Sequence, residues 1–257
     1  MTNYQAITFF DLDGTLLDGH SKITPEIATA IQALKENDIL PVIATGRTEM
    51  EIKQIMRDAG ITSAVTMNGS CISVEGEEIY SVRISKEECQ KMRDHIEEQG
   101  HALCFYNREN IWSTHHTETM RKAYGFIHSD VPPIDPSAFQ DHPINMLLIL
   151  SESGDEYYHE RFPDMTFYRN SPYSIDTVRK GISKGAGVKR LKETLQLENV
   201  PTFGFGDGPN DFALLEACDH KIAMGNAYDE LKELATFITK KNTEGGIVHA
   251  LKHFELI

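Results

Sequence analysis

The sequence predicts an α/β protein whose Rossmann-like parallel-sheet core is interrupted by an inserted α+β domain. Short apolar runs alternate with amphipathic stretches over about the first 70 residues, and the same alternation returns after about residue 183. Alternating strands and helices joined by short turns build right-handed βαβ units and a parallel sheet. In the middle of the chain, apolar runs follow one another without a helical stretch between them, which favours antiparallel pairing.

Each expected element of the first region has a local signal. Thr24 and Pro25 open one helix and Thr48 opens the next, because threonine caps helix ends and proline suits the first turn. Gly60 supplies a left-handed stop after the second helix. Buried strands are expected at the apolar runs Ala6–Phe10, Val42–Ala44 and Ala64–Met67.

The last region repeats this pattern. Ser183 is the expected cap of a helix that carries Val188, Leu191 and Leu195 on one face. Strands and helices then alternate: the expected strands are Thr202–Phe205, Lys221–Met224 and Phe237–Thr239, and the expected helices are Asp211–Cys218, Tyr228–Ala235 and Ile247–Phe254.

The middle region, from about Val82 to Lys180, predicts an α+β unit, because several of its strands are adjacent in sequence. The expected helices are Lys86–Gln99, Glu118–Tyr124 and Asp155–Arg161. The expected strands are Ala102–Tyr106, Ile111–Ser113, Ile144–Leu150, Thr166–Arg169 and Tyr173–Val178.

Composition and charge exclude several classes of function. The chain has 257 residues, 40% of them hydrophobic and 25% charged, so one large or two smaller folded domains are expected. It carries 39 Asp and Glu against 25 Lys and Arg, a formal net charge of −14. Because nucleic acids and anionic membranes attract basic patches, this balance argues against either partner. A small anionic substrate stays open, provided that a few cations or a metal ion neutralise it locally.

The remaining global features predict a cytoplasmic protein. The cysteines Cys71, Cys89, Cys104 and Cys218 show no paired spacing, which favours reduced thiols over disulfides or a zinc site. The first residues show no basic stretch followed by an apolar one, so no secretion signal is expected. The longest apolar runs, such as Met146–Leu150, fall far short of the roughly 20 residues of a membrane helix.

Four short clusters carry the candidate chemistry. Three of them follow expected strands, and the one that contains Lys184 opens a helix. Because parallel sheets bind ligands beyond the carboxyl ends of their strands, these clusters should meet in one crevice. They are the segments Asp11–Thr15, Thr45–Gly46, Ser183–Gly185 and Gly206–Asp211.

Four aspartates in these clusters predict a magnesium site. Asp11, Asp13, Asp207 and Asp211 should lie within several ångströms of one another. Two like charges about 4 Å apart repel by about 4 kcal/mol at an effective dielectric near 20, so the group needs protons or a cation. Ligation by oxygen atoms alone is what Mg²⁺ accepts.

The same groups predict phosphoryl chemistry. A hard cation, Lys184, a threonine hydroxyl and glycine amides form an anion site suited to a phosphoryl group. An aspartate beside the metal and the phosphoryl group can attack phosphorus and form an acyl phosphate. A second carboxyl two residues along the loop can protonate the leaving oxygen and then deprotonate a water molecule.

The clusters resemble the four motifs of the haloacid dehalogenase (HAD) superfamily in order and in spacing. The matching segments are DLDGT at Asp11–Thr15, TGR at Thr45–Arg47, SKG at Ser183–Gly185 and GDGPND at Gly206–Asp211. Three further segments narrow the resemblance to the Cof-type phosphatases: Asn68–Ser70, Met224–Ala227 and Thr243–Gly246. Each motif is weak alone, but four in register along the whole chain are specific.

The resemblance implies a role for each candidate residue. Asp11 is the implied nucleophile, Asp13 the acid/base, and Lys184 the cation that neutralises both the nucleophile and the phosphate. The implied phosphate-binding groups are the backbone at Leu12 together with Thr45, Gly46, Lys184 and Asn210.

The resemblance also implies the cofactor and the substrate class. Mg²⁺ is implied to bind the carboxylates of Asp11 and Asp207 and the main-chain carbonyl of Asp13, while Asp211 orients the metal shell through water. The implied activity is hydrolysis of small phosphomonoesters, such as sugar phosphates or related phosphorylated metabolites, through a phospho-aspartate on Asp11.

Motif spacing predicts where the insertion lies. Thr15 to Thr45 leaves room for one loop and one helix, whereas Arg47 to Lys184 far exceeds the roughly 30 residues of a βαβ unit. We expect a core of residues 1–81 and 183–257, a cap of residues 82–182, and hinges near residues 80–84 and 178–183. By resemblance, such a cap closes over the core and supplies side chains that contact the substrate.

Alternative interpretations remain beside this one. The segment at Asp11 could be a plain Asx-rich turn, but not a calcium loop, because its glycine is fourth rather than sixth. Gly204–Gly208 suggests a dinucleotide loop, yet Pro209 replaces the third glycine. A phosphotransferase or phosphomutase, which differs only in the phosphoryl acceptor, and a non-catalytic binding module are the rival functions.

The cap sequence is less informative. His115 and His116 are candidates for substrate contact by placement alone, against a surface or structural role, and Tyr173–Asp176 and Arg179 are candidates because they adjoin a hinge. Trp112 is expected to pack inside the cap. The sequence leaves the physiological substrate and the oligomeric state undetermined.

Overall fold

The computed structural model describes residues 4–127 and 129–257. The chain forms two compact units. The larger unit consists of Met1–Tyr80 and Ser183–Ile257, and the smaller unit is Ser81–Ile182. The smaller unit is therefore a single insertion into the larger one.

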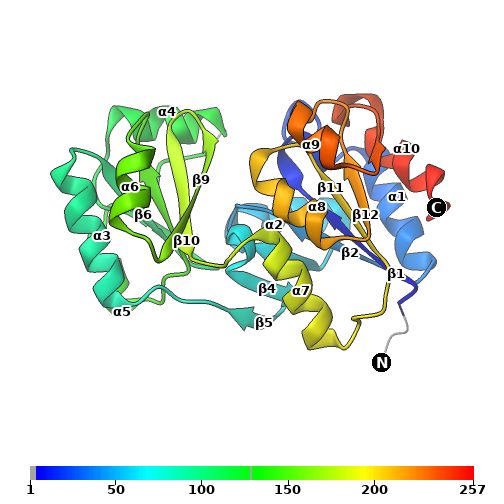
Figure 1. The fold of residues 1–257 in the computed structure, drawn as a ribbon, viewed down its shortest axis with the longest axis horizontal. Helices are drawn as coiled ribbons and strands as arrows, with labels where there is room; N and C mark the ends of the chain where they lie inside the picture. The colour runs from blue at the N-terminus through cyan, green and yellow to red at the C-terminus, as the bar shows by residue number, and fades with distance from the viewer. Residues whose placement is uncertain (1–3, 128) are drawn as a thin grey trace. The chain divides into compact units, whose positions relative to one another are not determined.

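The larger unit is built on an eight-stranded sheet in the order β13-β12-β11-β1-β2-β3-β4-β5 (Figure 1). The strands from β13 to β3 pair in parallel, and β4 pairs with β3 antiparallel. The strand bounds are β1 Ala6–Phe10, β2 Ile39–Ala44, β3 Ser63–Thr66, β4 Cys71–Val74, β5 Glu77–Ser81, β11 Thr202–Gly206, β12 His220–Ala223 and β13 Phe237–Ile238. The fold class predicted from the sequence is confirmed.

Helices cover both faces of this sheet because the central strands are apolar on both sides. In β1, Phe10 packs with the helices of one face, whereas Ile7 and Phe9 pack with those of the other. The first face carries α1 Pro25–Glu36, α2 Glu49–Ala59 and α10 Gly246–His253. The second carries α7 Lys184–Leu195, α8 Phe212–Ala217 and α9 Asp229–Leu234.

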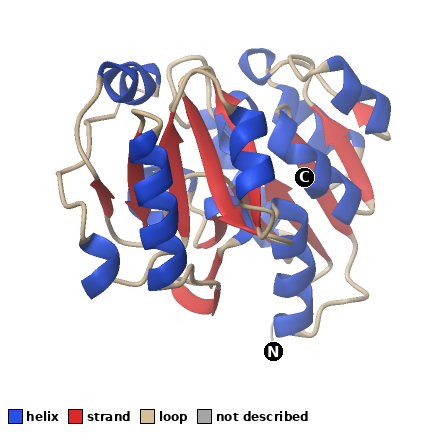
Figure 2. Cartoon of the chain, turned by 60° about the vertical axis from the view of Figure 1, so that its left-hand side comes forward, coloured by secondary structure: helices blue, strands red, loops and turns tan. Residues whose placement is uncertain are grey.

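The smaller unit contains an antiparallel five-stranded sheet in the order β7-β6-β8-β10-β9. Figure 2 shows the helices and strands of the chain in a second view. Met92 and Tyr158, from helices α3 and α6, pack on Phe105 in the core of one face. On the other face, the hydroxyl groups of Tyr124 and Tyr106 lie 2.6 Å apart. The element bounds are α3 Lys86–Glu98, β6 Ala102–Tyr106, β7 Ile111–Ser113, α4 Glu118–Phe126, α5 Ala138–Asp141, β8 Met146–Leu150, α6 Asp155–Arg161, β9 Met165–Ser171 and β10 Ser174–Arg179.

The main departure from the expected elements is the β4–β5 hairpin, which lies where no strands were expected. Its two-residue turn, Glu75 and Gly76, has φ angles of 51° and 85°. Positive φ at both central residues gives the twist that such a hairpin needs. The third strand also ends at Thr66 rather than at Met67, because Met67 has a φ of 49° and leaves the extended conformation.

No helix among the described residues is long and apolar enough to cross a membrane.

Candidate active site

Adjacent parallel strands place two aspartates side by side. Asp11 follows β1 and Asp207 follows β11, and the Asp11 amide continues the pairing by donating to the carbonyl of Phe205 at 3.0 Å. Asp211 comes from the short helical turn Pro209–Asp211 that follows the same strand. The carboxyl edge of the sheet therefore collects acidic groups from two of the predicted clusters.

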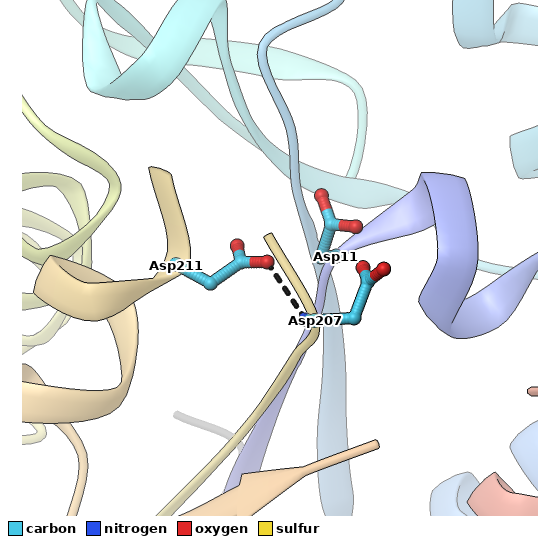
Figure 3. Close-up of side chains that lie close together, drawn as sticks. All are labelled: Asp11, Asp207 and Asp211. Atoms are coloured by element: carbon cyan, nitrogen blue, oxygen red, sulfur yellow. Dashed lines mark hydrogen bonds between the residues drawn. The ribbon is translucent and has the colours of Figure 1, made fainter. Parts of the chain in front are cut away.

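The carboxylates of Asp11, Asp207 and Asp211 form one compact group (Figure 3). One oxygen from each lies within 4.8 Å of the others. Asp11 and Asp211 are buried, and Asp207 is partly buried. Lys184 lies against this group: its Nζ donates to Asp11 Oδ1 at 2.6 Å and to Asp211 Oδ1 at 2.7 Å.

Lys184 reaches the acidic group from the first turn of α7. Ser183 caps that helix by accepting a hydrogen bond from the amide of Ala186 at 3.0 Å. A Cβ atom at Gly185 would lie 2.0 Å from the carbonyl oxygen of Ala213, so glycine is needed for α7 to approach α8 this closely. The close helix contact is what brings a lysine with only 1% exposure to the aspartates.

The Asp211 carboxylate is hydrogen-bonded to the backbone of its own loop as well as to Lys184. Its Oδ2 accepts hydrogen bonds from the amides of Asp207 at 3.0 Å and Gly208 at 2.9 Å; the first of these is drawn in Figure 3. This fully buried carboxylate thus accepts three hydrogen bonds, one from the Lys184 ammonium and two from backbone amides of its own loop. Asp211 is therefore better suited to shaping the loop that carries Asp207 than to binding a metal ion directly.

Asp207 is held at both oxygens. Thr15 Oγ1 donates to Oδ1 at 3.1 Å, and Asn226 Nδ2 donates to Oδ2 at 3.2 Å. Gly14 packs against the carboxylate so closely that a Cβ atom there would lie 2.2 Å from Oδ2, and its φ is 80°. Only glycine fits this position.

The electrostatics of the group show an excess of negative charge. Burial, together with Asp211, raises the pKa of Asp11 well above its ordinary value, although Lys184 lowers it. Burial and Asp211 also raise the pKa of Asp207 to about 6. Burial alone would lower the pKa of Lys184, but Asp11 and Asp211 raise it above its ordinary value. One ammonium group is too little to neutralise three carboxylates.

This donor set fits a divalent cation. Three carboxylates and one ammonium leave two negative charges, which a divalent ion would offset. Lys184 donates a hydrogen bond to Oδ1 of Asp11. Within the described part of the chain, Oδ2 of Asp11 accepts no hydrogen bond, so this oxygen is open to a metal ion. Carboxylate oxygens from Asp11 and Asp207 are the ligands that Mg²⁺ accepts.

Asp13 departs from the expected cluster of four carboxylates. Its side chain is 52% exposed and pairs with Arg47, whose Nε donates at 2.9 Å and Nη2 at 2.5 Å. Among the described residues, the metal-capable group contains only the other three aspartates. The guanidinium supplies two donors in a fork that matches both carboxylate oxygens, which explains why Asp13 turns toward it.

The remaining predicted phosphate-binding residues lie on loops of the same unit. Thr45 is buried directly after β2, and its amide donates to the carbonyl of Val65 at 2.9 Å. The side-chain Nδ2 of Asn210 donates to the side-chain Oδ1 of Asn68 at 3.1 Å. The backbone N–H of Asn68 donates to the Thr45 carbonyl at 3.0 Å. Asn68 therefore links the loops of Thr45 and Asn210. Leu12 is buried and Gly46 partly buried.

Sequence reasoning assigned no role to three residues that the structure ties to the site: Arg47, Asn68 and Asn226. Each lies in a segment that carried the family resemblance, so their presence was visible but their partners were not. The only local signal was that asparagine tolerates positive φ, and Asn68 has a φ of 53°.

In the smaller unit, several candidates already have structural partners. His116 Nε2 lies 2.8 Å from the carbonyl oxygen of Pro132, and Arg179 forms an ion pair of 2.9 Å with Glu88. Trp112 stacks on His142 with ring centroids 4.5 Å apart. These contacts favour packing roles for His116 and Trp112.

Comparisons with known proteins show what the chain is similar to. A family model described as haloacid dehalogenase-like hydrolase matches residues 8–251. YkrA of Bacillus subtilis (strain 168) is 30% identical over 253 residues, with 98% of each chain covered. The 5-amino-6-(5-phospho-D-ribitylamino)uracil phosphatase YwtE of the same organism is 27% identical, with 93% of this chain and 94% of the relative covered. The structure of the HAD subclass IIB sugar phosphatase BT4131 is 28% identical, has a TM-score of 0.87, and covers 98% of this chain and 100% of its own.

Proposed function

The chain belongs to the haloacid dehalogenase-like hydrolases, and on this premise we propose that it is a magnesium-dependent phosphatase acting on small phosphomonoesters. The observation that carries the proposal is the buried Lys184 ammonium, 2.6 Å from the carboxylate of Asp11, which lies in one group with that of Asp207. A fixed cation beside a buried carboxylate is the arrangement that a nucleophile for an anionic phosphoryl group requires.

Asp11 is the proposed nucleophile. A carboxylate oxygen of Asp11 attacks phosphorus, the bond from phosphorus to the ester oxygen breaks, and a phospho-aspartate forms. Lys184 offsets the negative charges that meet in this step, and Thr45, Gly46, Asn210 and the backbone at Leu12 bind the phosphoryl oxygens. Water then attacks phosphorus, which releases inorganic phosphate and regenerates Asp11.

Asp13 is the proposed acid/base. It gives a proton to the leaving oxygen in the first step and takes a proton from the attacking water in the second. In the present structure Arg47 holds its carboxylate, so Asp13 would exchange this ion pair for contact with the leaving group. The exposed side chain of Asp13 has the room for such a change.

Asp11, Asp207 and the main-chain carbonyl of Asp13 are the proposed ligands of Mg²⁺, and Asp211 holds the loop around them. When bound, the ion supplies positive charge that orients and polarises the phosphoryl group. This assignment is supported by the two uncompensated negative charges of the buried group.

The smaller unit is the proposed cap that selects the substrate. This part of the proposal is supported by its insertion as one continuous segment between two halves of the unit that carries the acidic group. The structural relative BT4131 is a sugar phosphatase, which supports sugar phosphates as the substrate class. A phosphotransferase is the second candidate, since it would use the same residues and differ only in the acceptor.

Turnover of p-nitrophenyl phosphate tests the proposal. We expect Mg²⁺-dependent release of p-nitrophenol that EDTA abolishes and that the Asp11→Asn variant lacks. Circular dichroism of Asp11→Asn serves as the folding control. Because uncatalysed phosphomonoester hydrolysis is extremely slow, even weak catalysis would be visible above background. Release that does not depend on Mg²⁺, or that equals the release by Asp11→Asn, would refute the proposal.

A further inference from the structure

The turn after β12 places an asparagine against the acidic group. Strand β12 pairs with β11, with Ala223 opposite Gly206, so the turn that follows lies beside the loop of Asp207. The side-chain nitrogen of Asn226, Nδ2, donates to the Gly14 carbonyl at 2.8 Å and to Asp207 Oδ2 at 3.2 Å. Asn226 is thus the partner of one carboxylate oxygen, while Thr15 is the partner of the other.

A second asparagine fixes the direction of this amide. The backbone N–H of Asn242 donates to Asn226 Oδ1 at 3.0 Å, and the Asn242 side chain donates to the carbonyl of Leu17 at 2.8 Å. Because a backbone N–H can only donate, the Asn226 oxygen must face it, and the NH₂ group must face Asp207. The hydrogen bonds form one chain from Leu17 to the carboxylate.

Close backbone packing holds the two asparagines in place. A Cβ atom at Gly225 would lie 2.8 Å from the amide nitrogen of Lys241, and one at Gly246 would lie 2.2 Å from the Lys240 carbonyl oxygen. The Gly225 amide donates to the Lys240 carbonyl at 3.0 Å. The segment from Lys240 to Gly246 is therefore packed directly on the turn that carries Asn226.

We propose that Asn226 is a positioning residue that holds the Asp207 carboxylate in its metal-binding orientation, with Asn242 as its anchor. This assignment rests on the proposed metal site. It also gives a physical reason for the segment Met224–Ala227, which contains Asn226, while Gly246 of the segment Thr243–Gly246 packs on Lys240 beside the anchor. Hydrogen-bond partners that orient a metal ligand change metal affinity by about 10–100-fold when they are removed.

Binding of Mn²⁺ to the full-length chain, followed by the electron paramagnetic resonance signal of the unbound ion, tests the assignment. We expect Asn226→Ala to bind Mn²⁺ at least about tenfold more weakly than the wild type. Asn242→Ala should lose less affinity, because it keeps the backbone N–H that contacts Asn226. The catalytic rate of Asn226→Ala should recover at saturating Mg²⁺, which a disrupted fold would not allow.

Asn37→Ala is the matched control. It also removes a side-chain amide that donates to a backbone carbonyl at 2.8 Å, that of Leu256, but it lies before β2, at the opposite end of the strand from Thr45. We expect it to bind Mn²⁺ like the wild type.

Four results would overturn the assignment. Two of them require a wild type that still binds the ion and hydrolyses phosphate esters: unchanged Mn²⁺ affinity in Asn226→Ala, or an equal loss of affinity in Asn37→Ala. If Asn226→Ala does not fold, wild-type affinity in Asn226→Ser, which also lacks the side-chain amide, has the same meaning. A wild-type chain that binds no Mn²⁺ refutes the proposed metal site as well.

Discussion

Individual contacts around Asp207 set the orientation and the pKa of its carboxylate. The carboxylate is fixed by Thr15 and Asn226, crowded by Gly14 and placed beside two further carboxylates. With the Lys184 ammonium bonded to Asp11 and Asp211, Asp207 bears much of the unneutralised negative charge. Burial, together with the neighbouring charge of Asp211, raises the pKa of Asp207 to about 6 in the protein without a metal ion.

Metal binding should therefore depend on pH. The pKa of Asp207 lies above its ordinary value of 3.8, so protonation stabilises the metal-free fold at low pH, and this contribution is lost as the pH rises through about 6. A bound cation must displace that proton. Below pH 6, we expect Mn²⁺ affinity measured by calorimetry to fall about tenfold per pH unit, with little change above pH 7. A constant affinity from pH 5 to pH 8 would contradict this cause of the shift.

At the scale of elements, the site depends on helix α7 lying close to its neighbours. Gly185 allows α7 to meet α8, and Gly187 allows it to approach Val65, where a Cβ atom would lie 2.4 Å from a valine methyl. The result is that Lys184 enters the acidic group from a helix, whereas Asp11 and Asp207 enter it from strand ends.

The contact between α7 and α8 predicts a stability change. Gly185→Ala would place a Cβ atom 2.0 Å from the Ala213 carbonyl oxygen, so we expect it to destabilise the larger unit by about 1–3 kcal/mol. Gly125→Ala in α4 is the control, because a Cβ atom there meets nothing within 4 Å, and its alanine should be neutral or stabilising by up to about 1 kcal/mol. Urea unfolding followed by circular dichroism measures both. Equal midpoints for Gly185→Ala and the wild type would show that the helices can separate at no cost.

Elements with strong local signals could be predicted, and elements set by turn geometry could not. Helix α2 begins at the Thr48 cap and ends at Gly60, which has a φ of 68°, as the residue types indicated. The β4–β5 hairpin could not be predicted because its turn needs a positive φ at Glu75. Glutamate does not favour that conformation, so the residue type gives no sign of the turn.

The candidate site shows the same division. Strand ends predicted that Asp11 and Asp207 meet, since neighbouring parallel strands end at one edge. Nothing in the sequence showed that Arg47 would draw the Asp13 carboxylate away, because that contact depends on the conformation of two loops. The links through Asn68 and Asn226 likewise depend on contacts between distant segments.

At the scale of the whole molecule, the charge balance sets the class of partner. The chain has a net charge of −14, although its proposed substrate is itself an anion. The positive charge that would neutralise this substrate lies within the site, where Lys184 contacts Asp11. A surface of this sign does not attract a polyanion.

We therefore expect no binding to nucleic acid. The fluorescence anisotropy of a labelled DNA duplex at physiological salt should not change up to about 50 µM protein, a range in which ordinary non-specific DNA-binding proteins do bind. A basic DNA-binding domain serves as the positive control. Saturable binding in the micromolar range would show that the charges are segregated into a basic patch.

Trapping of the covalent intermediate tests whether Asp11 is the nucleophile. Enzyme turning over a phosphomonoester in Mg²⁺ is quenched with acid and reduced with borohydride, which converts an acyl phosphate of aspartate to homoserine. We expect homoserine at position 11 in the peptide mass spectrum, and none in Asp11→Asn or in enzyme without substrate. Homoserine at another aspartate, or none while substrate is being hydrolysed, would contradict this role of Asp11.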